Sequence, residues 1–209
     1  PGTSGTAPNI YPNSSSPYYL TAVGTSLYFT AYDSTHGSEL WKLSGGITSV
    51  IEIVAGATSS YPSQMTALGN TLYFSATGSN GSELFKYDGN TLTFDDLYPG
   101  LTNTYQNSSY PGQFTVLGNN LFFTANDGSN GNELWKVGVS SAPVMVPNIN
   151  AGADSSSPTA LRAVGDKLFF VADDGSTGME LWVWDGVAPT RVKDINSGAA
   201  TGAADIFPQ

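Results

Sequence analysis

Cysteine is absent from this chain, histidine occurs once, and basic residues are scarce. The lack of cysteine excludes disulfides and cysteine-based catalysis, and a single histidine does not supply the ligands of a usual zinc site. Only 7 lysines and arginines stand against 17 acidic residues, which gives a net charge of −10 over 209 residues. Because phosphate groups are bound by basic patches, we expect neither nucleic acid nor an anionic membrane surface as a partner.

Long apolar runs are also missing, and charged residues of either sign make up only 11% of the chain. No run approaches the roughly 20 residues of a membrane span. Serine, threonine, asparagine and glycine supply the polarity, and such a neutral surface repels neighbouring molecules only weakly. The composition therefore favours an extracellular or cell-surface location. The chain begins at Pro1 without a signal peptide, and we interpret it as a processed form.

A repeated block is the main feature that is present. Four segments match one another and end in glycine: Leu20–Gly24, Met65–Gly69, Phe114–Gly118 and Leu161–Gly165. Each is followed by an apolar segment, at residues 26–31, 71–76, 120–125 and 167–172. A glycine-rich turn then leads to Glu-Leu-Trp or Glu-Leu-Phe, whose glutamates are spaced by 44, 50 and 47 residues. This is the period of the four-stranded blades of a β-propeller.

Each repeat is predicted to contain four short strands and no helix. Segments 121–123 and 168–171 are apolar at consecutive positions, so both faces of these strands should be covered, as in a blade between two neighbours. We therefore predict an all-β fold, a small β-propeller with four blades of about 47 residues and an extra N-terminal strand, with other stacked β arrays as the alternative. The single repeat domain 1–209 divides into an N-terminal strand and linker and the four blades, at residues 1–19, 20–63, 64–112, 113–159 and 160–209.

The N-terminus resembles the fourth strand of a repeat. The fourth strands are predicted at residues 51–54, 94–97, 145–149 and 192–195, and the segment from Ala7 to Pro17 resembles the third of these with its serine-rich tail. A closed ring of four blades then has five candidates for four outermost strands. The surplus strand, with Pro8, Asn9, Ile10 and Tyr11, could complete the last blade, lie on the surface, or pair with a neighbouring molecule and link copies head to tail.

At the Glu-Leu-Trp segments the sequence resembles the bacterial ELWxxDGT-repeat family, over nearly the whole chain and at four sites. The resemblance implies an exported or surface-associated repeat protein without known catalytic residues. The sequence departs from the pattern at Phe85, which replaces tryptophan, and keeps Asp-Gly only at Asp88-Gly89 and Asp185-Gly186. The final threonine of the pattern is replaced by Asn90 and Val187.

The repeated glutamates and aromatic residues are interpreted as structural. An acid in every repeat does not mark a single active site, and each carboxylate should accept hydrogen bonds in the preceding turn. The aromatic rings should pack between blades, with stacking on a sugar as the alternative for an exposed ring. These structural positions are Glu39, Trp41, Glu83, Phe85, Glu133, Trp135, Glu180 and Trp182.

No residue pattern points to an enzyme or to a bound cofactor. The turns that begin at Asp127 and Asp174 are acidic and rich in glycine, which makes them weak candidates for calcium, although an aspartate that stabilises its own turn is the favoured explanation. No nucleophile elbow or phosphate loop occurs between a strand and a helix, and no acid stands out from the repeat. We therefore expect a protein without enzymatic activity.

The sequence predicts an extracellular structural protein that assembles into a fibre, tube or surface layer through β contacts between propeller subunits. The prediction rests on the surplus strand, the low charge and the abundance of serine, threonine, asparagine and glycine. The alternative is a lectin-like carbohydrate-binding module with repeated pockets between blades, in which several weak sites add up through avidity.

Overall fold

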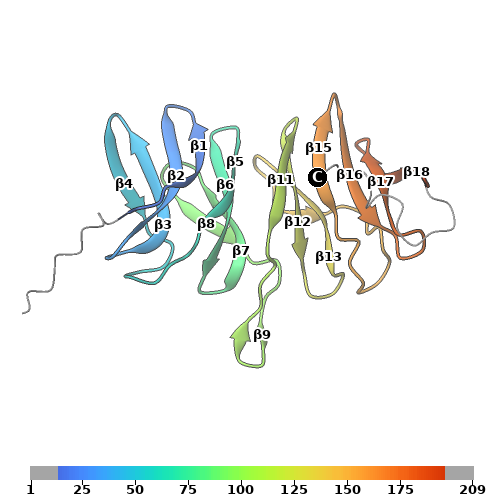
Figure 1. Cartoon of the computed structure of the whole chain (residues 1–209), viewed down its shortest axis with the longest axis horizontal. Coiled ribbons are helices and arrows are strands. Elements are labelled where there is room, and N and C mark those ends of the chain that lie inside the picture. The colour runs from blue at the N-terminus through green and yellow to red at the C-terminus, as the bar shows by residue number, and fades with distance from the viewer. Residues whose placement is uncertain (1–13, 196–209) are drawn as a thin grey trace, which may run out of the picture.

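The computed structural model describes residues 14–195, which form four antiparallel four-stranded sheets and one short hairpin (Figure 1). The first sheet contains β1 (Tyr18–Val23), β2 (Ser26–Asp33), β3 (Gly37–Ser44) and β4 (Ile47–Ile51). The second contains β5 (Ser63–Leu68), β6 (Thr71–Gly78), β7 (Gly81–Tyr87) and β8 (Leu92–Asp95). The third contains β11 (Gly112–Leu117), β12 (Asn120–Asn126), β13 (Asn132–Gly138) and β14 (Val144–Met145). The fourth contains β15 (Thr159–Val164), β16 (Lys167–Asp173), β17 (Met179–Trp184) and β18 (Pro189–Lys193).

Every sheet is a meander in which consecutive strands pair, so each repeat folds as one blade of the propeller type. The turn between the first and second strands depends on a glycine in the left-handed region, for example Gly24 at φ 57° and Gly165 at φ 62°. The all-β prediction is confirmed. The part of the chain described by the structure has no helix that is long and apolar enough to cross a membrane.

The fourth strands lie earlier in the sequence than predicted. Strand β4 ends at Ile51 and β8 at Asp95, where strands were expected to continue to residues 54 and 97. The reason is that residues just after these strands leave the sheet ladder, because the N–H groups of Ile53 and Leu97 donate hydrogen bonds to buried glutamates.

Three separate apolar clusters fill the three interfaces between neighbouring sheets. The second strand of each inner sheet contributes to both of its interfaces. In β6, Phe74 packs towards the first sheet while Tyr73 packs towards the third, and both are at most 2% exposed. In β12, Phe123 packs towards the second sheet and Phe122 towards the fourth. The expected burial on both faces is therefore observed for residues 121–123 in β12, whereas Phe169 in β16 is only half-buried, so the expectation for residues 168–171 holds in full on one face only.

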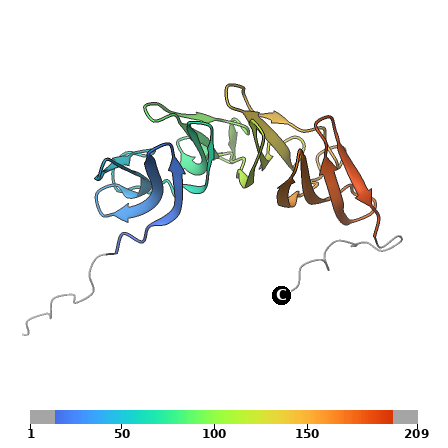
Figure 2. The ribbon, with the colours of Figure 1, turned by 90° about the horizontal axis from the view of Figure 1, so that it is seen from above.

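The four sheets form an open arc, with the first and the fourth at opposite ends (Figure 2). Their first strands follow one another, since β1 contacts β5, β5 contacts β11, and β11 contacts β15, whereas β1 and β15 share no comparable contact. The expected closure of a four-bladed ring is thus wrong for residues 14–195. A closed ring of four sheets requires the fourth sheet to return to the first, and in Figure 2 these two sheets stay apart. The number of blades in a complete propeller stays a prediction.

One element of the structure has no counterpart in the other repeats. The hairpin of β9 (Leu101–Thr102) and β10 (Tyr105–Gln106) extends from the link between the second and third sheets, away from the blades (Figure 1). This insertion accounts for the longest of the three repeat spacings. The predicted assembly strand, with Pro8, Asn9, Ile10 and Tyr11, lies outside the described residues.

Because the arc is open, the same substitution at two equivalent positions should lower the free energy of unfolding by different amounts. Phe122 in β12 is 1% exposed between the third and fourth sheets, whereas Phe169 in β16 is half-buried on the outer face of the fourth sheet. We expect Phe122→Ala to lower the free energy of unfolding by about 3–5 kcal/mol. Phe169→Ala should lower it by only about 1 kcal/mol. Urea denaturation of dilute protein measures both, and equal losses would mean that the outer face is covered.

Candidate functional site

A buried glutamate near the start of the third strand joins each sheet to the next. Glu39 in β3 is fully buried, and its Oε2 accepts hydrogen bonds from the Ile53 N–H at 2.9 Å and the Ser60 hydroxyl at 2.7 Å. The carbonyl of Ser60 accepts a hydrogen bond from the N–H of Thr77 in β6 at 2.8 Å. Ser60 therefore connects the glutamate of the first sheet with the second strand of the next sheet.

The same connection recurs at the next two links. Glu83 accepts hydrogen bonds from the Ser109 hydroxyl at 2.5 Å and the Ser109 N–H at 3.0 Å. Glu133 accepts hydrogen bonds from the Ser156 N–H at 2.6 Å and the Ser156 hydroxyl at 2.5 Å. We call this the Glu–Ser connection, formed by Glu39–Ser60, Glu83–Ser109 and Glu133–Ser156. The partners lie in the link after the fourth strand, and not in the preceding turn as predicted.

The two ends of the arc each carry one half of this connection. At the fourth sheet, Glu180 is fully buried and its Oε2 accepts a hydrogen bond from the Ile195 N–H at 3.3 Å, but no serine within residues 14–195 reaches it. At the first sheet, Ser15 occupies the serine position, because its carbonyl accepts the N–H of Tyr32 at 2.8 Å. Within the described range, Ser15 has no glutamate partner.

Burial changes the titration of the connected glutamates. Desolvation raises the pKa of Glu39, Glu83 and Glu133 above the usual value, and the hydrogen bonds from the serine and backbone groups offset part of this increase. A buried carboxylate is costly unless it is hydrogen-bonded, so the serine stabilises the glutamate in each of the three connections.

The repeated tryptophans are held in place by their own sheets. Each indole N–H donates a hydrogen bond at 3.0 to 3.1 Å to an alanine carbonyl of the neighbouring strand, in the pairs Trp41–Ala31, Trp135–Ala125 and Trp182–Ala172. Trp135 and Trp182 are 8% and 9% exposed, which leaves no free face for a sugar. Trp41 is half-buried, because no sheet precedes the first one within the described residues.

The two calcium candidates stabilise the turns that contain them. Asp127 Oδ1 accepts hydrogen bonds from the N–H groups of Ser129 and Asn130, at 2.9 and 2.8 Å. Asp174 makes the equivalent contacts, and its Oδ2 lies 3.4 Å from Arg191. Partial burial acts to raise the pKa of Asp174, but these hydrogen bonds outweigh it and lower the pKa to about 2. In residues 14–195 no cluster of three or more acids and histidines is arranged to hold a metal ion, and calcium binding stays a prediction.

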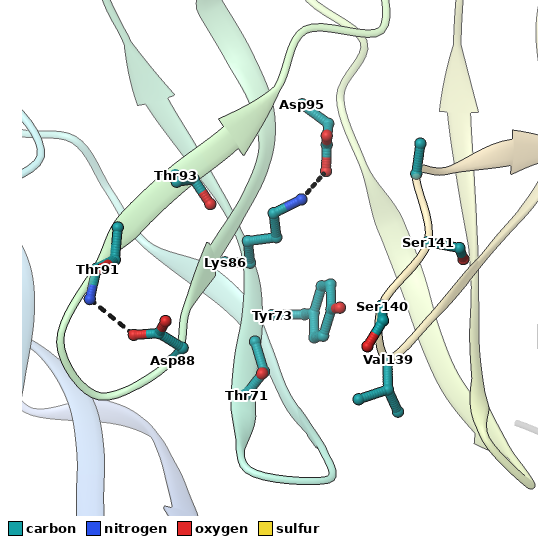
Figure 3. Close-up of a pocket in the computed structure, with 11 residues that line it drawn as sticks. Thr71, Tyr73, Lys86, Asp88, Thr91, Thr93, Asp95, Val139, Ser140 and Ser141 are labelled. Atoms are coloured by element: carbon teal, nitrogen blue, oxygen red, sulfur yellow. Dashed lines mark hydrogen bonds and ion pairs between the residues drawn. The ribbon is translucent and has the colours of Figure 1, made fainter.

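A polar cleft opens between the second sheet and the turn that follows β13 (Figure 3). Its volume is about 480 Å³, and its lining includes the ion pair of Lys86 Nζ and Asp95 Oδ2 at 3.0 Å. Asp88 accepts hydrogen bonds from the N–H groups of Asn90 and Thr91, at 2.8 and 2.7 Å. Hydroxyl groups supply the rest of the polar lining, from Thr71, Tyr73, Thr91, Thr93, Ser140 and Ser141.

This cleft combines hydroxyl-bearing side chains with charged side chains that already have partners in the protein. Both of its carboxylates accept hydrogen bonds from neighbours, so the arrangement suits a neutral ligand with several hydroxyls better than an ion. The sequence alone does not indicate this cleft, because Val139 to Ala142 lie in a turn that differs between repeats and meet the second sheet only in the folded chain.

No protein-family model matches the chain, and no curated protein matches it. Solved structures with a similar chain path include the Bacteroides ovatus xyloglucan-locus protein GH43B, at 14% identity and a TM-score of 0.40 over 87% of this chain and 42% of that chain. Another is the SapL1 lectin in complex with alpha methyl fucoside, at 15% identity and a TM-score of 0.44 over 85% of this chain and 63% of that chain. A third is the AtxE2 isopeptidase, at 16% identity and a TM-score of 0.30 over 80% of this chain and 32% of that chain. The chain thus spans less than two thirds of each of these proteins.

The raised pKa of the connected glutamates predicts a pH dependence of stability. A group whose pKa is higher in the folded state stabilises the fold below its unfolded pKa, and this contribution is lost as pH rises through the folded pKa. Relative to Glu133→Gln, the wild-type chain should therefore lose unfolding free energy as pH rises above 4.5, the usual glutamate value. Urea denaturation between acidic and neutral pH tests this, with Glu83→Gln as a second variant. Parallel pH profiles of wild type and variants would contradict it.

Proposed function

We propose that this chain is a non-enzymatic extracellular structural module, related to the ELWxxDGT-repeat proteins, that assembles with copies of itself. The observation that supports the proposal is that the two ends of the arc carry complementary halves of the interface that joins the sheets internally. The contact is assigned to the outer faces of the first and fourth sheets. The predicted strand at Pro8–Tyr11 lies outside the described residues and stays a separate possibility for the same contact.

The apolar side chains of the two end faces match those of the internal interfaces. At each internal interface, the later sheet contributes the leucine, phenylalanine and alanine of its second strand, together with its tryptophan or Phe85. The earlier sheet contributes an aromatic residue and a leucine, such as Tyr28 and Leu40. The outer face of the first sheet has the former set, including half-buried Phe29 and Trp41. The outer face of the fourth sheet has the latter set, Phe169 and Leu181, also half-buried.

Polar groups at the same two faces are complementary as well. Glu180 is a buried carboxylate without a serine partner in residues 14–195, and Ser15 is held in the position of Ser60 without a glutamate. A copy that places its first sheet on the fourth sheet of another would supply the missing serine. Each large apolar side chain buried in this contact would contribute about 1.5–3 kcal/mol. Such a contact is heterologous, so it yields rings or filaments depending on whether the curvature closes.

A charge introduced at one face tests the proposal. We expect wild-type protein to form assemblies that grow with concentration, as measured by light scattering after size exclusion and by electron microscopy. Leu181→Asp should reduce the association constant at least tenfold, because it places a charge in the apolar contact. Leu101→Asp in the β9–β10 hairpin is the matched control, since its side chain is 62% exposed and lies away from both end faces. Monomers at every concentration would refute the proposal.

A mixing experiment tests the head-to-tail arrangement. Phe29→Asp alters only the first sheet and Leu181→Asp only the fourth, so neither variant should assemble alone. Mixed, they should form dimers, because each supplies the face that the other has lost. Failure of the mixture to associate, where wild type does assemble, would mean that copies meet through other surfaces.

Carbohydrate binding at the cleft of Figure 3 is a second candidate function. It is favoured by the paired Lys86 and Asp95 and the surrounding hydroxyls, which together provide donors and acceptors for a polyhydroxylated ligand. Lys86→Ala should weaken glycan binding at least tenfold, as measured by calorimetry with a ligand found on a glycan array. Lys42→Ala is the matched control, because Lys42 has the equivalent position in the first sheet. An array without any binding would remove this candidate.

A further inference from the structure

The second sheet departs from the other three repeats at one place. Phe85 stands where the other sheets have tryptophan, and Gly78 stands where they have aspartate. The turn between these two positions is also shorter, since 6 residues lie between Ala76 and Glu83 and 7 lie between the equivalent pair in each other repeat. In a repeat protein, the residues that all repeats share are explained by the fold. Differences that gather at one place in one repeat therefore indicate a function at that place.

All three departures border a single cavity. Its volume is about 220 Å³, and it lies between the second sheet and the link that follows the first sheet. Ile53 lines it from that link, and the short turn lines it from the other side. The lining side chains that matter for a ligand are Ile53, Asn80, Phe85, Leu92 and Phe94.

The substitutions at residues 78 and 85 depend on one another. A Cβ atom at Gly78 would lie 2.9 Å from Cζ of Phe85, so the phenyl ring occupies the space above the glycine. An aspartate at this position, like Asp33, would collide with the ring in its present place. Phenylalanine is also smaller than tryptophan and lacks the indole N–H that bonds to Ala125 in the third sheet. The cavity therefore follows from both changes together.

Aromatic rings form a column that ends at this cavity. The rings of Phe74 and Phe85 are stacked with centroids 5.7 Å apart, and those of Phe85 and Phe94 are 5.3 Å apart at an interplanar angle of 31°. Exposure rises along the column, from 0% at Phe74 to 5% at Phe85 and 40% at Phe94. A further planar ring placed in the cavity would continue the column, which is the favoured arrangement for aromatic groups.

The side chains of Glu83 and Asn80, which line the cavity, are already paired. Both oxygens of Glu83 accept hydrogen bonds in the Glu–Ser connection. The amide of Asn80 donates to Asp96 at 2.9 Å and accepts from the Ser79 hydroxyl at 2.9 Å. A sugar would find few free partners here, and a cation would meet no free carboxylate on Glu83. The cavity thus differs from the polar cleft of Figure 3 in the ligand that it suits.

We propose that this cavity is a binding site for a small planar aromatic molecule that packs against the rings of Phe85 and Phe94. Size supports the match, because an apolar cavity of about 150 Å³ holds a benzene molecule in another protein. The site occurs once in residues 14–195, since only the second of the four described sheets has both the phenylalanine and the glycine. It is independent of the assembly proposed above, because its lining comes from neither outer face.

Indole is the probe for this site. We expect wild-type protein to bind one indole molecule in a saturable manner, with nuclear Overhauser effects between indole protons and the Phe94 ring. Phe85→Trp should fill the cavity with the side chain found in the other repeats and weaken indole binding at least tenfold. Phe94→Leu should weaken it as well, which covers the case of a Phe85→Trp chain that does not fold. Thr71→Ala in the polar cleft is the control and should leave indole binding unchanged.

The binding measurements decide whether the cavity is an aromatic site. Saturable binding that both Phe85→Trp and Phe94→Leu reduce supports the site. Absence of saturable binding to wild type overturns it, as does binding that a folded Phe85→Trp chain retains in full. Methyl glucoside serves as a second ligand, and its binding at Phe94 in preference to indole would also overturn the proposal, because it would make the site one for carbohydrate.

Discussion

The hydrogen bonds between a buried glutamate and the serine of the next link are the interaction on which this arc depends. A carboxylate out of water is stable only when donors reach it, and Ser60, Ser109 and Ser156 each supply a hydroxyl group to one. The same serines accept hydrogen bonds from the second strand of the following sheet. One residue thus bonds to both the end of one sheet and the beginning of the next, and the apolar clusters fill the space between the sheets.

Much of the fold was predictable from the sequence, because four matching copies of a segment support one assignment of secondary structure better than a single copy does. The first three strands of each sheet follow from matching segments with glycine turns, and the buried strands follow from consecutive apolar residues. The fourth strands were placed too late, because residues such as Ile53 and Leu97 are apolar like strand residues but donate their N–H groups to glutamates. Ring closure was also wrongly expected, since it depends on the angle between sheets and not on any residue pattern.

The candidate sites were harder to predict for a different reason. The repeated Glu and Trp are the most evident pattern in the sequence, yet in the described sheets their hydrogen bonds go to serine and backbone groups that hold the sheets together. The polar cleft and the aromatic cavity are built from positions where repeats differ, such as Val139 and Gly78, and a difference between repeats has no meaning until its neighbours in space are known. Departures from the repeat therefore indicate candidate sites better than the repeat does.

The separation of the apolar core into three clusters has a consequence for how this chain melts. Each cluster joins only two neighbouring sheets, so the energetics resemble those of a linear array in which stability is a sum over adjacent pairs. A terminal sheet is held by one cluster and an inner sheet by two. Unfolding should accordingly proceed from the ends inward, and amide protons of β2 and β16 should exchange with solvent sooner than those of β6 and β12. A neighbour docked on an end face would remove this difference at that end.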